Sequence, residues 1–109
     1  MRGFVEDLAR LDRSDEVVVM MFTEFGRRVE ENASQGTDHG TATPMFVVGA
    51  PIKGGMYGRH PSLTDLDDGN LRMTTDFRRV YATLVDGWLG YRDTASILKG
   101  TFEPFKLFT

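Results

Sequence analysis

The sequence predicts an α/β fold in which a few buried strands are flanked by helices. Two apolar runs, Val17–Phe22 and Pro44–Gly49, lack polar alternation, which is typical of strands covered on both faces in a parallel or mixed sheet. The stretch Phe77–Trp88 instead repeats apolar residues every three or four positions, which predicts an amphipathic helix that faces a sheet. Apolar strands that alternate with such helices indicate an α/β domain.

Residues 3–12 are predicted to form a short helix ahead of the first strand. Its apolar side chains fall at helical spacing, with charged side chains on the other side, and they are Phe4, Val5, Leu8 and Leu11. That apolar face needs a sheet to pack against. A helix followed almost at once by a buried strand is the pattern of the middle of an α/β domain, so we expect the gene product to extend ahead of Met1.

Between the two strands, Thr23–Thr43 is polar and contains several glycines. We expect a loop there, with at most a turn or two of helix over Phe25–Glu31. A loop of this length in a compact domain is usually functional or disordered. Because it leaves the carboxyl end of a buried strand, where ligands bind in open α/β sheets, its position favours a function.

Three more features are predicted in the second half of the chain. The acidic run Asp65–Asn70 has turn chemistry and lacks the register of a calcium loop, so we expect a solvated turn. Asp93 or Thr94 is expected to start a last short helix through Leu98. The apolar tail from Phe102 to Phe108 is expected to lie against the domain, or against whatever the domain belongs to.

Length and composition exclude several classes of protein. A chain of 109 residues is one domain at most, and its content of 40% hydrophobic and 27% charged residues argues against disorder. A net charge of -3 gives no basic field for nucleic acid and no polybasic face for a membrane. Cysteine is absent, which excludes disulfides and thiolate metal sites. The longest apolar run is too short for a membrane span, and no export signal is expected in this stretch of sequence.

The loop carries the strongest candidate site, Gly36-Thr37-Asp38-His39-Gly40. An adjacent carboxylate and imidazole between glycines can converge on one divalent ion, for which zinc, manganese and calcium are the candidates. Zinc needs at least one further ligand, and His60 and Glu24 are available in the chain. The alternative is an Asp-capped turn with a hydrogen-bonded histidine.

Arg27 and Arg28 follow the first strand and form the second candidate site. An arginine fork there could hold a phosphate, a sulfate or a carboxylate, and the alternative is a solvated or salt-bridged pair. Nucleophilic catalysis finds less support, since the chain has no cysteine and no Gly-x-Ser-x-Gly elbow. General acid/base work by Glu24 or His39 is left open, so the catalytic residues stay unassigned.

Several short motifs occur in a fixed order along nearly the whole chain. They are Thr23-Glu24-Phe25-Gly26-Arg27, Asn32, Gly36-Thr37-Asp38-His39-Gly40, Pro44–Gly49, Lys53-Gly54-Gly55 with Gly58, Thr75-Asp76-Phe77-Arg78 and Trp88-Leu89-Gly90. The ordered series Glu-Phe-Gly-Arg, Asp-His-Gly and Asp-Phe-Arg is more specific than any one of its parts. Together the motifs resemble the C-terminal part of a bacterial family catalogued as domain of unknown function 1501, which is distantly similar to sulfatases and alkaline phosphatases.

The resemblance implies a three-layer alkaline-phosphatase-like fold, of which residues 1–109 form a single, incomplete C-terminal segment. The site residues that it implies are Asp38 and His39 as ligands of a divalent metal, with Glu24, Arg27 and His60 as candidates for the pocket. The nucleophile and the remaining ligands would precede Met1. Members of the family are commonly exported by twin-arginine signals, so the full-length parent is expected in the periplasm or outside the cell.

The leading hypothesis is therefore a fragment of a metalloprotein whose parent hydrolyses phosphate or sulfate esters of small molecules. The fragment alone is expected to be inactive. The alternative is a non-catalytic binding or scaffold module that retains the fold. A third possibility is a small domain that dimerises through exposed strand edges. Neither nucleic acid nor a membrane is expected as a partner.

Overall fold

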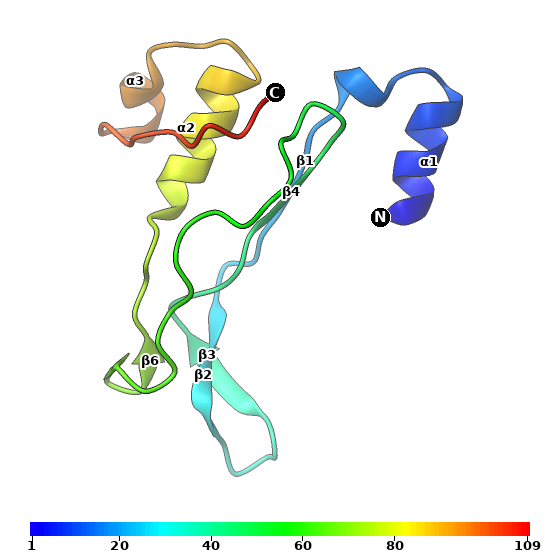
Figure 1. Cartoon of the computed structure of the whole chain (residues 1–109). Coiled ribbons are helices and arrows are strands. Elements are labelled where there is room, and N and C mark those ends of the chain that lie inside the picture. Colours follow the sequence, from blue (N-terminus) through cyan, green and yellow to red (C-terminus); the bar gives the residue numbers. More distant parts are fainter. The chain divides into compact units, whose positions relative to one another are not determined.

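Figure 1 shows the computed structural model of residues 1–109, which combines helices with small strand pairs. The elements in chain order are α1 (Arg2–Arg10), the 3-10 helix η1 (Ser14–Glu16), β1 (Val19–Met21), β2 (Gly26–Glu31), β3 (Thr37–Gly40), β4 (Phe46–Val48), β5 (Leu66–Asp67), β6 (Asn70–Leu71), α2 (Phe77–Gly87) and α3 (Thr94–Leu98). They group into two compact units, residues 1–20, 47–55 and 77–109 in one and residues 21–46 and 56–76 in the other. A mixed fold of helices and strands was expected and is confirmed.

The core of the first unit lies on α2. Ala82 is fully buried and Leu107 of the C-terminal tail is 6% exposed. Between them the buried Thr83 uses its hydroxyl twice, donating to the Arg79 carbonyl at 2.7 Å and accepting from the Phe105 amide at 2.8 Å. A buried hydroxyl that is satisfied both ways holds the tail against the helix.

The apolar tail packs along the first unit, as predicted. The Phe108 ring stacks on Trp88, with ring centres 6.0 Å apart and planes 17° apart. An isolated antiparallel bridge joins Phe108 to Ile52. Two backbone hydrogen bonds lie beside this bridge, from the Lys53 amide to the Leu107 carbonyl at 2.7 Å and from the Thr109 amide to the Pro51 carbonyl at 3.1 Å.

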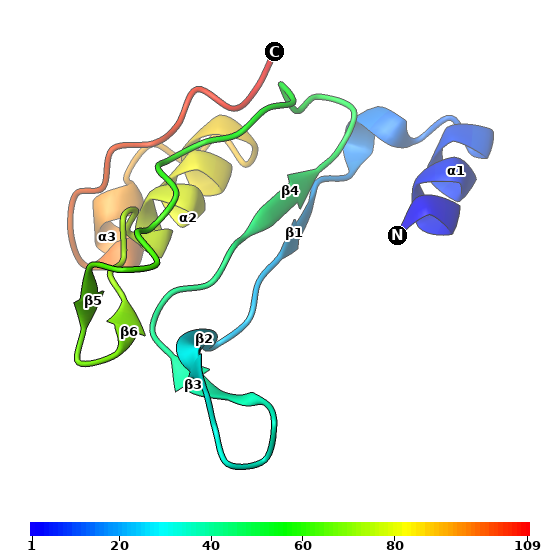
Figure 2. The same ribbon diagram turned by 60° about the horizontal axis from the view of Figure 1, so that its bottom comes forward.

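The helix predictions are confirmed to within a residue or two. The α2 helix ends before Gly90, whose φ of 70° suits the left-handed residue that follows a helix. The α3 helix begins where it was expected, because the Asp93 side chain caps it by accepting from the Ser96 amide. In Figures 1 and 2 the short α3 lies beside α2, and the two helices are in contact.

The α1 helix is amphipathic but buries none of its residues completely. Phe4 remains 48% exposed and Leu11 68%. On the same helix Val5 and Leu8 line a small apolar cavity of about 230 Å³. The other residues around this cavity come from the segments of β1 and β4, and they are Ser14, Val17, Val19, Val48, Gly49 and Ala50.

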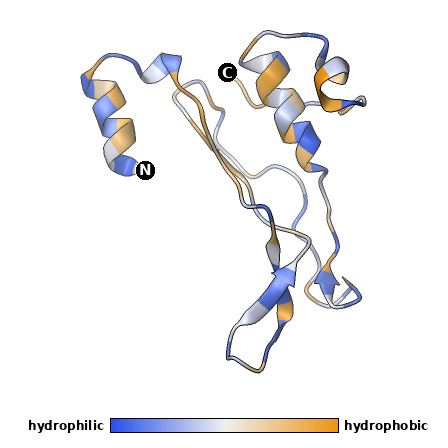
Figure 3. Cartoon of the chain, turned by 180° about the vertical axis from the view of Figure 1, so that it is seen from behind, coloured by the Kyte–Doolittle hydropathy of each residue, from blue (hydrophilic) through white to orange (hydrophobic).

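The two predicted strands are present, but they are not buried on both faces. β1 and β4 pair with each other in a sheet of two strands, and Figure 3 shows both as hydrophobic. All three residues of β1 keep intermediate exposure. The expectation of strands enclosed in a larger parallel or mixed sheet is therefore wrong for this chain, because each strand has a single neighbour.

The second unit contains an antiparallel hairpin where a loop was expected. Arg27 in β2 pairs with His39 in β3, and Gly26 pairs with Gly40. The expected turn of helix over Phe25–Glu31 is wrong, since Gly26–Glu31 is strand β2. The turn at the end of the hairpin is built on Asn32, whose side-chain oxygen accepts from the Ser34 and Gly36 amides at 3.0 and 3.1 Å. Polar side chains that bond their own backbone favour such turns over helix.

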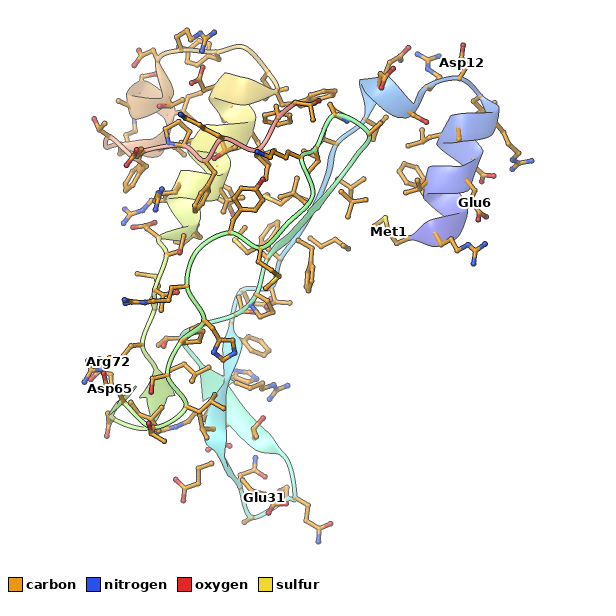
Figure 4. The ribbon with its side chains drawn as sticks, in the orientation of Figure 1. Met1, Glu6, Asp12, Glu31, Asp65 and Arg72 are labelled. Atoms are coloured by element: carbon orange, nitrogen blue, oxygen red, sulfur yellow. The ribbon has the colours of Figure 1, made fainter.

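A second, shorter hairpin confirms the predicted turn in the acidic run. β5 and β6 pair antiparallel around the two-residue turn Asp68-Gly69, and both turn residues have positive φ, 48° and 79°. This is the Asp-Gly signature of a type I′ turn. Figure 4 shows Asp65 and Arg72 side by side at its base, with an ion pair of 3.1 Å. β6 contacts β2 within the same unit.

Candidate functional site

Asp38 and His39 lie next to each other on β3, and both side chains are exposed. Successive side chains of a strand point to opposite faces. Asp38 and His39 therefore lie on opposite faces of the hairpin in this conformation. Their roles as metal ligands stay predictions.

The Asp38 carboxylate is held by the turn. Its Oδ1 accepts a hydrogen bond from the side-chain amide of Asn32 at 3.0 Å. Because the Asn32 oxygen already bonds two turn amides, one side chain fixes both the turn and the carboxylate. A carboxylate has lone pairs to spare, so this single bond leaves Asp38 able to bind a cation.

The imidazole of His39 stacks flat on the Phe25 ring. The ring centres are 3.6 Å apart and the planes differ by 15°. The guanidinium of Arg27 lies over the same Phe25 ring at 5.2 Å, and its Nη1 donates to the Thr37 carbonyl at 2.7 Å. Arg27 and His39 are also direct cross-strand partners. Phe25, Arg27 and His39 thus share one face of the hairpin.

Glu24 and Arg27 line one open depression of about 550 Å³ in the second unit. The other residues around it are Thr23, Phe25, Gly26, Ala42, Thr43, Pro44 and Leu71. The hydroxyls of Thr23 and Thr43 lie 3.0 Å apart. The structure thus brings together two of the three predicted pocket residues.

His60, the third predicted pocket residue, does not line this depression. Its Nδ1 lies 2.7 Å from the Pro61 carbonyl, which can only accept, so this ring nitrogen donates the hydrogen bond.

The donor set fits part of a metal site. A carboxylate and an imidazole are suitable ligands for zinc and manganese, and a carboxylate is suitable for calcium. Nowhere along residues 1–109 do three or more His, Asp or Glu side chains gather closely enough to hold an ion. Zinc sites take at least three protein ligands.

The sequence did not predict that Phe25 would stack on His39, or that Thr23 and Thr43 would be in contact. The signal for Phe25 was its position two residues before Arg27, since residues at i and i+2 of a strand share a face. That signal depends on recognising β2 as a strand. The contact between Thr23 and Thr43, twenty residues apart, has no local signal.

Comparison with known proteins gives a family for the chain. A family described as "Protein of unknown function (DUF1501)" matches over residues 1–102. The chain belongs to the DUF1501 family. The DUF1501 match includes the β2–β3 hairpin with Asp38 and His39, both long helices and the beginning of the tail. No curated protein and no solved structure matches the chain. None of the helices in this DUF1501 chain has the length and apolar character needed to cross a bilayer.

Proposed function

We propose that this DUF1501 chain is the C-terminal part of an alkaline-phosphatase-like metalloprotein that hydrolyses phosphate or sulfate esters of small molecules. In this proposal Asp38 and His39 contribute to a divalent-metal site, and the complete domain has three layers. Family membership and the order of the Glu-Phe-Gly-Arg and Asp-His-Gly motifs support it. The full-length parent would act in the periplasm or outside the cell.

The observation that carries the proposal is the exposed pair of donors on β3. Asp38 makes one hydrogen bond, to Asn32, and the ring of His39 is held by stacking on Phe25. Stacking fixes the plane of an imidazole without using its ring nitrogens, so it remains a competent ligand. The nearby depression adds Arg27 and Glu24 as groups that can face a substrate.

Groups outside this chain would complete the site. Because Asp38 and His39 lie on opposite faces, each can reach an ion from its own side, and a single ion shared by both would require Thr37–Gly40 to leave the extended conformation. A bound divalent ion supplies Lewis-acid activation of a phosphoryl or sulfuryl oxygen. Within this chain, Arg27 binds and orients the ester anion, and Glu24 faces the same depression.

The test is a thermal unfolding titration of the full-length parent with Zn²⁺, Mn²⁺ or Ca²⁺ after removal of bound metal. Binding to the folded state alone stabilises it by about 2.7 kcal/mol at a metal concentration of 100 Kd, which raises Tm by several degrees. Asp38→Ala and His39→Ala should each reduce this rise. His60→Ala tests whether the second histidine is a further ligand.

The matched control is Asp67→Ala, which removes an exposed carboxylate from the other hairpin. It should leave the metal-dependent rise in Tm intact. Two results would overturn the metal site. One is a parent protein whose Tm does not rise with metal, and the other is a rise in Tm that is equally large in Asp38→Ala, His39→Ala and Asp67→Ala.

A non-catalytic binding or scaffold module is the second candidate. The hydrogen bond from Asn32 to Asp38 favours it, because it gives the carboxylate a purely structural use in the turn. In that case Asp38→Ala lowers the Tm of the metal-free parent and His39→Ala changes neither stability nor metal response. The same titration therefore separates the two candidates.

A further inference from the structure

One face of the β2–β3 hairpin carries two hydrogen-bond donors that lie against one aromatic ring. Arg27 and His39 are direct partners across the strands, and both lie against the Phe25 ring. Cross-strand partners have Cβ atoms about 5 Å apart. Two long side chains that start from neighbouring Cβ atoms can reach oxygens of the same small anion.

The guanidinium of Arg27 has no carboxylate partner. Several other arginines of this chain are ion-paired, as Arg72 is with Asp65 and Arg92 with Asp86. Arg27 instead gives one N–H to the Thr37 carbonyl, which fixes the guanidinium and leaves its remaining N–H groups for a ligand. A fixed fork of this kind matches two oxygens of a phosphate or sulfate group.

The surroundings of Arg27 add one opposing charge and no free hydroxyl donor. Thr23 and Thr43 line the same depression, but Thr23 donates its hydroxyl proton to the Phe25 carbonyl at 2.7 Å and Thr43 donates its own to Thr23 at 3.0 Å. The Glu24 carboxylate lies in the same lining and repels an anion. Glu24 therefore limits affinity for a bare anion, and its neutralisation should improve binding.

We propose that in the metal-free chain Arg27 and His39 form a binding site for a tetrahedral oxyanion, phosphate or sulfate, on the face of the hairpin opposite Asp38. His39 can take this role and the proposed metal role because one ring nitrogen can donate to the anion while the other binds a metal ion. The inference deepens the proposed function by assigning the anionic end of the substrate, and it rests on that function only for the idea that the anion is part of an ester. Phe25 is a positioning residue, because it holds both donors and has no group that bonds an anion.

The test is an NMR titration of the metal-free full chain with inorganic phosphate and with sulfate. The chain has two histidines, so the imidazole signals of His60 serve as an internal reference for those of His39. We expect saturable shifts of the His39 signals and none at His60. A parallel titration with phenyl phosphate distinguishes an ester site from a free-anion site. Only an ester site should bind phenyl phosphate at least as tightly as inorganic phosphate. Equal additions of chloride show what ionic strength alone does.

Variants identify the groups that bind. Arg27→Gln should weaken phosphate binding about tenfold or more, the size expected for losing a charge-assisted donor. Arg27→Lys keeps the charge without the fork, so its phosphate affinity should lie between those of the unmodified chain and Arg27→Gln. Arg28→Gln is the matched control, since the adjacent Arg28 alternates to the other face and donates to the Asp68 carbonyl. Glu24→Gln should tighten binding.

Two outcomes would overturn the inference. One is the absence of a saturable shift at His39 with phosphate or sulfate. The other is an equal loss of affinity in Arg27→Gln and Arg28→Gln, which would indicate binding by overall charge. The amide signals of Gly26 and Thr37 in each variant show whether the hairpin is still folded, and where it is not, Arg27→Lys decides. The phosphate titration contains no metal, so its failure would not affect the result of the metal titration. Failure of the metal titration would likewise not affect the phosphate result.

Discussion

Thr83 shows how a single polar side chain secures the end of the chain. Its hydroxyl is buried, donates back to the helix carbonyl of Arg79 and accepts from the Phe105 amide. The Arg79 side chain adds to this attachment, with its Nε donating to the Glu103 carbonyl at 2.8 Å and its guanidinium over the Phe105 ring at 4.3 Å. The tail is therefore held by polar groups as well as by apolar packing.

Thr83→Val should destabilise the chain by about 1–3 kcal/mol, because it keeps the shape of the side chain but leaves the Phe105 amide without its acceptor. Urea unfolding followed by circular dichroism should show a lower midpoint with an unchanged slope. Thr83→Ser, which keeps the hydroxyl, should recover most of the loss. Thr101→Val, at an exposed position in the same tail, should stay within about 0.5 kcal/mol of the parent sequence. A midpoint for Thr83→Val equal to that of Thr101→Val would contradict this account.

The candidate site residues could be chosen from the sequence, but their geometry could not. Asp38 and His39 stood out because a carboxylate and an imidazole, both metal-ligand types, are adjacent in a stretch flanked by glycines. Their separation onto two faces follows only once β3 is known to be a strand. His60 was chosen because it is the other histidine, and composition alone says nothing of its distance from the Glu24 and Arg27 depression.

At the level of elements, the β2–β3 hairpin depends on a close approach at Gly26. A Cβ built on Gly26 would lie 1.6 Å from the Ala42 carbonyl oxygen, which is backbone and cannot turn aside. Gly26 is also the partner of Gly40, whose own Cβ would lie 2.8 Å from the Arg27 backbone. The two glycines allow the chain segments to touch here.

Gly26→Ala should loosen the hairpin, since the added methyl forces backbone to move at a cost of about 1–3 kcal/mol or more. Amide hydrogen exchange at Asn32, whose N–H bonds the Gly36 carbonyl at 2.8 Å, measures the effect and should become faster. Gly54→Ala is the control, because a Cβ there meets nothing within 4 Å. Unchanged exchange in Gly26→Ala would show that the approach is not tight in solution.

Helices were predictable and the hairpin was not, for a physical reason. The periodic apolar residues of Phe77–Trp88 and the capping Asp93 are local signals, and helices depend on local contacts. The β2 sequence Arg27-Arg28-Val29-Glu30-Glu31 has one apolar residue, so no buried strand could be read from it. Its pairing with β3 is a contact between segments, and only the turn built on Asn32 marks it locally.

At the level of the whole molecule, most large apolar side chains keep solvent contact. Ala82 and Leu107 are the buried hydrophobic residues of the chain, while Met56 is 98% exposed and Leu89 70%. Exposed apolar surface of this kind marks interaction sites or a tendency to aggregate.

The isolated chain should bind the dye ANS, because that dye reports accessible apolar surface. Met56→Glu should lower ANS fluorescence while changing the free energy of unfolding by no more than about 0.5 kcal/mol, since the side chain packs against little in this structure. ANS fluorescence and urea unfolding of the two proteins measure both quantities. If the isolated chain does not increase ANS fluorescence, its apolar side chains are covered in solution.

The stack of Trp88 on Phe108 makes intrinsic fluorescence a local reporter. Trp88 is the single tryptophan of the chain, and both rings belong to the unit that contains α2 and the tail. Indole emission therefore reports whether the tail stays on the helix. Detachment of the tail can therefore be timed by stopped-flow fluorescence without any added label.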